Sequence, residues 1–223
     1  MRALSVRVDD DPARRAARSI AQRLRAAVRT RGTAALAVSG GSTAPPMLDA
    51  LTAMDLPWEA IGTWQVDERV APDGDPDRNA TQLADFPGPL HLMPVTAERL
   101  AAAAAEYASG LPARFDVVHL GIGPDGHTAS WPPGDPVIAS TLAVDLSDEY
   151  QGRVRMTLTP PVIDVARGRV VLVQGADKAA AVAAWLEGDA SPAELPVSRV
   201  PTTGTVVVLD PSAASGLIAL GAR

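Results

Sequence analysis

Short segments that are apolar at nearly every position recur along this chain, and most are followed by a segment with helical spacing or by a polar loop. The clearest are residues 34–38, 115–120, 169–174 and 205–209. A strand that is buried on both faces reads as a continuous apolar run, whereas a strand with one solvated face alternates apolar and polar residues. The pattern therefore predicts a doubly wound α/β fold, with a mostly parallel sheet and helices on both faces.

The remaining predicted elements fill the spaces between these segments. Strands are predicted at residues 61–66, 138–144 and 154–158, and helices at residues 12–31, 43–54, 96–108 and 177–186, with a polar loop at residues 68–78. The first helix has the sharpest limits, because Asp11 and Pro12 suit a cap and first position and Gly32 suits a stop. No repeat or linker interrupts the pattern, so one domain over residues 1–223 is expected.

Charge and composition narrow the possible function classes. The chain has 223 residues, a net charge of −6 and no cysteine. An acidic balance argues against a nucleic-acid partner, since such binding rests on a basic face. No apolar run approaches about 18 residues and no signal peptide is visible, which favours a soluble cytoplasmic protein without a membrane partner. The absence of cysteine excludes disulfides, thiolate metal sites and a cysteine nucleophile.

Residues 121–130, Gly-Ile-Gly-Pro-Asp-Gly-His-Thr-Ala-Ser, are the segment best suited to chemistry, and they directly follow the strand at 115–120. Glycine allows turns with positive φ and a close approach of backbone to ligand, and the histidine, His127, suits general-base duty near neutral pH. The segment also matches a Gly-x-Gly-x-x-Gly dinucleotide fingerprint. That interpretation fails, because Pro132, Pro133 and Pro136 interrupt the helix that the fingerprint must open.

The other two histidines give weaker signals. His119 lies inside an apolar strand and is expected to be a hydrogen-bonded core residue, while His91 has no partner in the sequence. The three histidines of the chain do not show a recognisable zinc spacing. We therefore expect no metal.

A second glycine turn, Ser39-Gly40-Gly41-Ser42-Thr43, follows the strand at 34–38 and opens a helix. Its amide groups and hydroxyls could face a phosphate, where the helix dipole is positive. Ser42 or Thr43 could instead cap the helix as a purely structural turn. A third interpretation is a nucleophile elbow, since Gly40 to Ala44 approximates Gly-x-Ser-x-Gly with Ser42 as the nucleophile of a serine hydrolase.

Charged side chains follow the predicted strands at residues 61–66 and 169–174. Asp67, Glu68 and Arg69 follow the apolar residues near position 66. Because adjacent strand side chains point to opposite faces, at most one of the two acids aims at a given site. Arg69 offers a planar fork to phosphate or carboxylate, and Lys178 heads a predicted helix. Taken singly, each cation is more simply interpreted as part of a surface ion pair.

Together these segments resemble the 6-phosphogluconolactonases, within the wider group that includes glucosamine-6-phosphate isomerase. The residues 121–130 are the most specific match. The other matching pieces, in family order, are Ser39-Gly40-Gly41-Ser42-Thr43, Asp67-Glu68-Arg69 with Asn79, Arg155-Met156-Thr157-Leu158-Thr159, and Gly175-Ala176-Asp177-Lys178.

The resemblance implies hydrolysis of 6-phospho-D-glucono-1,5-lactone to 6-phosphogluconate, a step of the oxidative pentose phosphate pathway, without metal or organic cofactor. It implies that His127 takes a proton from water and that Asp67 lines the sugar site. The substrate-binding residues that it implies are Gly41, Ser42, Thr43, Arg69, Asp125, Gly126, Arg155 and Lys178. The expected partner is the small sugar-phosphate lactone.

The sequence after His127 separates the two activities of this group. Isomerases continue from Asp-Gly-His to an Asn-Glu-Pro whose glutamate serves ring opening, whereas Ser130-Trp131-Pro132-Pro133 offers no acid. Trp131-Pro132 also departs from the Leu-Phe usual in the lactonases, which concerns pocket shape more than reaction type. Two other function classes stay open from sequence, namely a serine esterase using Ser42 and a sugar-phosphate sensor without turnover.

Overall fold

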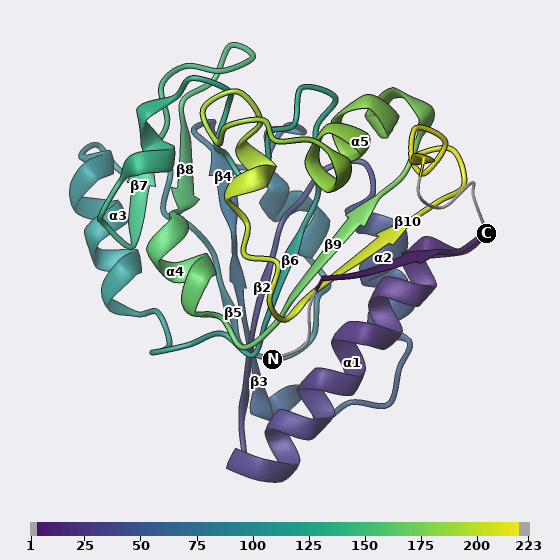
Figure 1. Ribbon diagram of the computed structural model, residues 1–223. Helices are drawn as coiled ribbons and strands as arrows, with labels where there is room; N and C mark the ends of the chain where they lie inside the picture. The colour runs from purple at the N-terminus through teal and green to yellow at the C-terminus, as the bar shows by residue number, and fades with distance from the viewer. Residues whose placement is uncertain (1–3, 219–223) are drawn as a thin grey trace.

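A computed structural model describes residues 4–218. Its centre is a seven-stranded sheet in which every neighbouring pair of strands runs parallel. In spatial order the strands are β1 (Ser5–Val8), β10 (Thr205–Leu209), β9 (Arg169–Val173), β6 (Val117–Leu120), β2 (Ala34–Val38), β3 (Ile61–Gln65) and β5 (Leu90–His91). The chain thus moves outward from β2 through β3 to β5, and then returns to the other side of β2 with β6 (Figure 1). This reversal places a topological switch point between β2 and β6.

Apolar layers cover both faces of the sheet, which confirms the predicted doubly wound fold. One layer is formed by α1 (Pro12–Arg31) and α2 (Ala44–Thr52), which pack on one face of the sheet. The opposite layer contains α3 (Leu100–Ser109), α4 (Pro160–Val165) and α5 (Ala179–Glu187) (Figure 1). Strands β2, β6 and β9 are buried along their whole length, as their continuous apolar sequences predict.

A second sheet of three antiparallel strands shares the layer of α3 to α5. Its order is β4 (Asp67–Arg69), β8 (Arg155–Leu158) and β7 (Val144–Leu146). The chain passes from one sheet to the other at Val66, whose amide donates to the Val38 carbonyl of β2 while its carbonyl accepts from the Leu158 amide of β8. The prediction of a polar loop at residues 68–78 is therefore wrong at its start, where Glu68 and Arg69 belong to β4.

The strand predicted at residues 138–144 is also wrong. Asp135 accepts a hydrogen bond from the Val137 amide at 2.8 Å, and Pro136 begins the 3-10 turn η3 (Pro136–Ala139), so β7 starts only at Val144. No α-helix occurs in residues 121–143, all of which the structure describes, and this agrees with rejection of the dinucleotide fingerprint. The prolines thus shape this segment as turns.

The predicted helix limits hold best where a cap fixes them. Asp11 accepts from the Arg14 amide at 3.1 Å, and Gly32 closes α1 with a φ of 81°. Helix α3 begins four residues later than predicted, and η4 (Ala176–Lys178) precedes α5. Several short elements were not predicted from the sequence: β1, β5, α4 and the 3-10 turns η1 (Trp58–Ala60), η2 (Asn79–Leu83) and η5 (Pro196–Arg199).

Candidate active site

The predicted site residues converge at the carboxyl ends of β2 and β6, where doubly wound folds collect ligands. A cavity of about 220 Å³ opens there. Of the ten predicted residues, eight line it: Gly41, Ser42, Thr43, Asp67, Arg69, His127, Arg155 and Lys178. Asp125 and Gly126 are not part of the lining. Gly126 has a φ of 83°, and a Cβ there would lie 2.2 Å from the Leu195 side chain, so its role lies in the turn and its packing.

The loop after β6 fixes the imidazole of His127. Nδ1 lies 2.6 Å from Oδ1 of Asp125, and the His127 amide donates to the same oxygen at 3.2 Å. A Cβ on Gly123 would lie 2.0 Å from the imidazole, so only glycine leaves room for the ring. Because an ionised carboxylate only accepts hydrogen bonds, Nδ1 carries the proton. Nε2, which contacts no described hydrogen-bond partner, is then the basic nitrogen.

Asp125 stays ionised for a physical reason. Burial acts to raise the pKa of its carboxyl, but hydrogen bonds from Tyr150 and His127 outweigh it, and the pKa lies below its ordinary value of 3.8. The Tyr150 hydroxyl donates to Oδ2 at 2.7 Å. Tyr150 and its neighbour Gln151, which lines the cavity, were not predicted as site residues from the sequence. The only local signal was Gly152, which suits a tight hairpin turn between β7 and β8.

The glycine turn after β2 is not a capped helix start. Thr43 occupies the cap position of α2 without a side-chain hydrogen bond. Pro45 and Pro46 fill the second and third helical positions, and proline has no amide hydrogen for a cap to accept. The hydroxyls of Ser42 and Thr43 therefore face the cavity without a capping duty. The amides of residues 41–43 also make no hydrogen bond to another described residue.

Ser42 lacks the features of a nucleophile elbow. Such a serine sits in a strained turn beside a histidine base. Within residues 4–218 the only non-glycine residues with positive φ are Ala129 and Gln151, and no described hydrogen bond joins Ser42 to a histidine. The side chain of Ser42 is exposed and lines the cavity.

The guanidinium groups of Arg69 and Arg155 line the cavity, and no described acidic side chain bonds to either Nε atom. Arg69 and Arg155 are paired in register across β4 and β8, and the Nε of each is buried and without a hydrogen bond to a described residue. Burial, and next the positive charge of Arg69, lower the pKa of Arg155. Lys178 differs, because its Nζ forms an ion pair with Asp177. Two like charges side by side favour an anionic ligand between them and the glycine turn.

Asp67 and Glu68 point to opposite sides, as strand geometry predicts. Asp67 lines the cavity at 5% exposure and accepts a 2.8 Å hydrogen bond from the Ser130 hydroxyl. Glu68 is fully buried and does not line the cavity. Its carboxylate accepts from Gln65 and from the amides of Arg69, Asn79 and Ala80.

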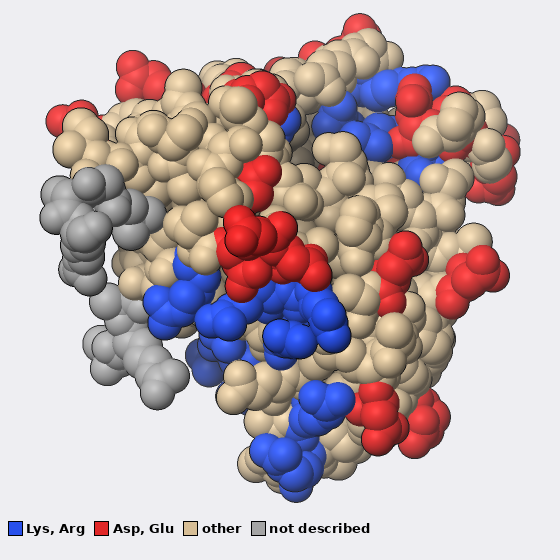
Figure 2. Space-filling view, turned by 90° about the vertical axis from the view of Figure 1, so that its right-hand side faces the viewer, with Lys and Arg blue, Asp and Glu red and all other residues tan. Residues whose placement is uncertain are grey.

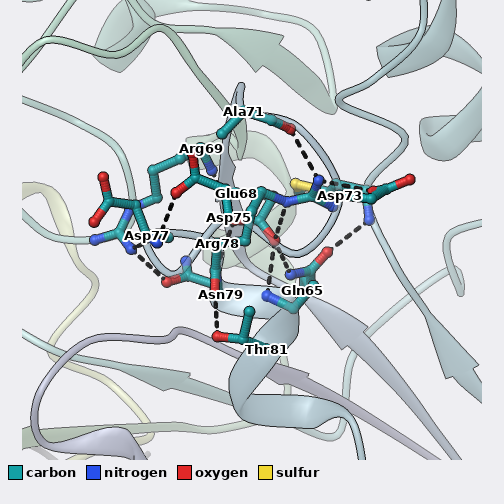
Figure 3. Close-up of polar contacts among 12 residues, drawn as sticks. Gln65, Glu68, Arg69, Ala71, Asp73, Asp75, Asp77, Arg78, Asn79 and Thr81 are labelled. Carbon is teal, nitrogen blue, oxygen red and sulfur yellow. Dashed lines mark hydrogen bonds and ion pairs between the residues drawn. The ribbon is translucent and has the colours of Figure 1, made fainter.

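Glu68 anchors the loop that follows the cavity residue Arg69 (Figure 3). Arg78 Nε lies 3.1 Å from Oε2 of Glu68. Arg69 in turn donates to the Asp77 carbonyl at 2.6 Å and to Oδ1 of Asn79 at 2.9 Å. Asn79 also packs against Gly40, where a Cβ would lie 2.2 Å from Oδ1. One buried carboxylate thus connects the loop after β4 to the glycine turn after β2.

The two other histidines lie outside the cavity. His119 is fully buried on β6, which confirms its expected core position. Neither ring nitrogen makes a hydrogen bond of ordinary geometry to a described residue, although the Ser39 backbone is the polar group that acts on the ring. Burial lowers its pKa to about 4, so it is neutral at physiological pH. His91 does have a partner, since its ring stacks on Trp64 with centroids 4.1 Å apart.

A larger groove of about 760 Å³ lies between α1 and the edge of the sheet at β1. Arg7, Arg15, Arg18 and Arg23 line it, and acidic side chains border the arginines (Figure 2). It contains no histidine or carboxylate, and it is remote from the switch point, so its size does not outweigh the chemistry of the smaller cavity. Within residues 4–218, no cluster of three potential metal ligands occurs, and no helix is long and apolar enough to cross a bilayer.

Known proteins resemble this chain in both sequence and fold. Residues 8–208 match the family described as glucosamine-6-phosphate isomerases/6-phosphogluconolactonase. A 6-phosphogluconolactonase of Synechocystis sp. is 33% identical over 218 residues, covering 89% of this chain and 90% of the relative. A 6-phosphogluconolactonase of Mycobacterium tuberculosis is 36% identical over 222 residues, covering 86% and 88%.

The fold has a solved counterpart as well. The crystal structure of a 6-phosphogluconolactonase from Shewanella baltica OS155 superposes with a TM-score of 0.83 and covers 94% of this chain and 97% of that chain. Its sequence identity is 24%, so this likeness concerns the fold.

Proposed function

This chain belongs to the glucosamine-6-phosphate isomerase/6-phosphogluconolactonase family, and we propose that it hydrolyses 6-phospho-D-glucono-1,5-lactone to 6-phosphogluconate with His127 as general base. The observation that carries the proposal is a single cavity in which an oriented imidazole faces two cations with unpartnered Nε atoms. The imidazole supplies base chemistry, and the cations select an anionic substrate. The three relatives named above are all 6-phosphogluconolactonases.

The hydrolysis needs one base and little further activation. Nε2 of His127 accepts a proton from water while the water oxygen bonds to lactone C1, and the carbonyl electrons move onto the carbonyl oxygen. The tetrahedral intermediate then collapses with cleavage of the bond between C1 and the ring oxygen, which takes the proton back from the imidazolium. Asp125 holds the ring in the required tautomer and stabilises its positive form. The unpaired amides of residues 41–43 are suited to the oxyanion or the phosphate.

The substrate phosphate is assigned to the cationic side of the cavity. Arg69 and Arg155 provide charge-assisted hydrogen bonds, and the hydroxyls of Ser42 and Thr43 lie on the same lining. Lys178 adds positive charge that Asp177 already balances in part. Asp67, which accepts a hydrogen bond from Ser130, can also accept hydrogen bonds from sugar hydroxyls.

The test compares the phosphorylated lactone with unphosphorylated gluconolactone, each corrected for spontaneous hydrolysis. We expect turnover of the phosphorylated lactone well above background, with a much higher kcat/KM than for gluconolactone. A sensor would bind the phosphorylated compound in calorimetry and leave its hydrolysis at the background rate. A serine esterase would be labelled at Ser42 by a fluorophosphonate, and either result would overturn the proposal.

A further inference from the structure

A tight turn between β7 and β8 reaches over the cavity from a part of the chain that carries no recognised motif. The turn runs from Tyr150 to Arg153, whose backbones exchange hydrogen bonds of 3.0 and 3.3 Å. Its two central residues, Gln151 and Gly152, have φ values of 53° and 77°, which is the geometry of a type I′ hairpin turn. Glutamine carries a Cβ and is an unfavourable choice for this conformation. The position thus calls for a reason other than turn stability.

The side chain of Tyr150 contacts three members of the site at once. Its hydroxyl donates to Oδ2 of Asp125 at 2.7 Å and lies 3.2 Å from Nδ1 of His127. Its ring packs edge-on against the imidazole, with centroids 5.3 Å apart, and the Arg155 guanidinium lies 4.9 Å from its centroid. Among the described residues, no other side chain donates to Oδ2 of Asp125, and without this bond the carboxylate is held through Oδ1 alone.

Gln151 extends these contacts into a continuous chain. Its Nε2 donates to the Tyr150 hydroxyl at 3.1 Å, and its Oε1 accepts from Nη2 of Arg155 at 3.1 Å. Arg155 is therefore linked through Gln151, Tyr150 and Asp125 to His127. The charged or titratable groups that face the tyrosine hydroxyl and ring are Asp125, His127 and Arg155.

We propose that Tyr150 is a positioning residue for the reaction, which fixes Asp125 and through it the imidazole of His127, and that Gln151 couples this arrangement to Arg155. The inference rests on the proposed function of His127. Burial and the hydrogen bond to Asp125 raise the pKa of Tyr150 to about 12, so the hydroxyl remains a donor across the working pH range. The strained φ of Gln151 is then explained by its two side-chain contacts.

Tyr150→Phe tests the inference because it removes only the hydroxyl and keeps the ring. We expect kcat to fall roughly 10-fold, as for loss of one hydrogen bond to a charged group, with KM changed less than about twofold. Without the O–H donor the Asp125 carboxylate is more basic and stabilises the imidazolium, so the acid limb of the kcat/KM profile moves to higher pH. Tyr107→Phe is the matched control, since that hydroxyl bonds to the Gln65 and His91 carbonyls outside the cavity.

Combining Tyr150→Phe with His127→Asn distinguishes the positioning role of Tyr150 from the general-base role of His127. If Tyr150 acts through His127, Tyr150→Phe lowers kcat less than about twofold when His127 is already replaced by asparagine. An equal loss in both backgrounds, or an unchanged rate and acid limb in the wild-type background, overturns the positioning role. Near-normal turnover of His127→Asn alone would instead overturn the proposed base, and the positioning role with it.

Gln151→Asn provides a second variant whose stability and activity should move apart. Asparagine is well suited to positive φ but too short to span Tyr150 and Arg155. We expect an unchanged or higher melting temperature together with a kcat/KM several-fold lower, on the order of one lost hydrogen bond. Wild-type kcat/KM in this variant would show that Gln151 does not couple the two residues.

Discussion

At the scale of single residues, the site depends on close contacts that fix one ring. The imidazole of His127 lies where a Cβ of residue 123 would stand, and its Nδ1 is held by Asp125. The sequence shows that glycines and a histidine share a loop, but it does not show which glycine faces the ring. It also does not show that Asp125 acts from behind the imidazole rather than from the cavity wall.

The proposed phosphate contact of Arg155 can be tested against its neighbour Arg153. Arg155→Ala should lower kcat/KM for the phosphorylated lactone roughly 10- to 150-fold, because a charge-assisted hydrogen bond to phosphate contributes about 1.5–3 kcal/mol. Hydrolysis of unphosphorylated gluconolactone should fall only several-fold, the loss expected when Arg155 no longer contacts Gln151 and Tyr150. Arg153→Ala is the control, since Arg153 pairs with Asp75 and does not line the cavity. Equal losses on both substrates would contradict a phosphate contact.

Ser42 separates direct attack by water from an acyl-enzyme. Because Ser42 has no histidine partner in the described structure, Ser42→Ala should remove one ligand contact and raise KM more than it lowers kcat. Steady-state kinetics over a range of lactone concentrations measure the two constants. An acyl group trapped on Ser42 and detected by mass spectrometry would refute direct attack.

At the scale of elements, the small antiparallel sheet brings together Asp67, Arg69 and Arg155, which are distant in sequence. This sheet was not predicted as a unit from the sequence. Strand β4 has only three residues, all charged, and it follows β3 after Val66 alone, so neither its length nor its pattern marks a new strand. Its hydrogen-bond partners lie in β8, and such long-range pairing leaves little trace in local sequence.

Glu68 should hold this element in place. Glu68→Gln leaves Arg78 buried beside a neutral amide, and loss of one partner of a buried ion pair costs about 3–5 kcal/mol. Chemical denaturation should show this loss of unfolding free energy. KM should also rise, because Asp77 and Asn79 of the loop hold the Arg69 side chain. Asp73→Asn is the matched control, because Asp73 pairs with the same arginine but its side chain is 84% exposed. This variant should lose less than about 1 kcal/mol of unfolding free energy. Similar effects of both variants would count against the anchor.

At the scale of the whole molecule, the sequence predicts the α/β architecture well because burial of the central strands on both faces leaves a continuous apolar signal. The site location follows from that architecture, since the motif-bearing loops after β2 and β6 meet at a switch point. The contribution of Tyr150 and Gln151 could not follow from the same reasoning. Their turn approaches His127 only through the packing of β7 and β8, which no local pattern encodes.

The turnover of His127→Asn on 6-phosphogluconolactone tests the general-base role of His127 most directly, with binding of 6-phosphogluconate measured by calorimetry on the same preparation. If His127 is the general base, kcat falls on the order of 10²- to 10⁴-fold while product affinity and the melting temperature stay near wild type. His91→Asn, which alters a histidine stacked on Trp64 away from the cavity, should retain full turnover. A His127→Asn variant that keeps more than about half of the wild-type kcat, with unchanged binding and melting, would contradict the account.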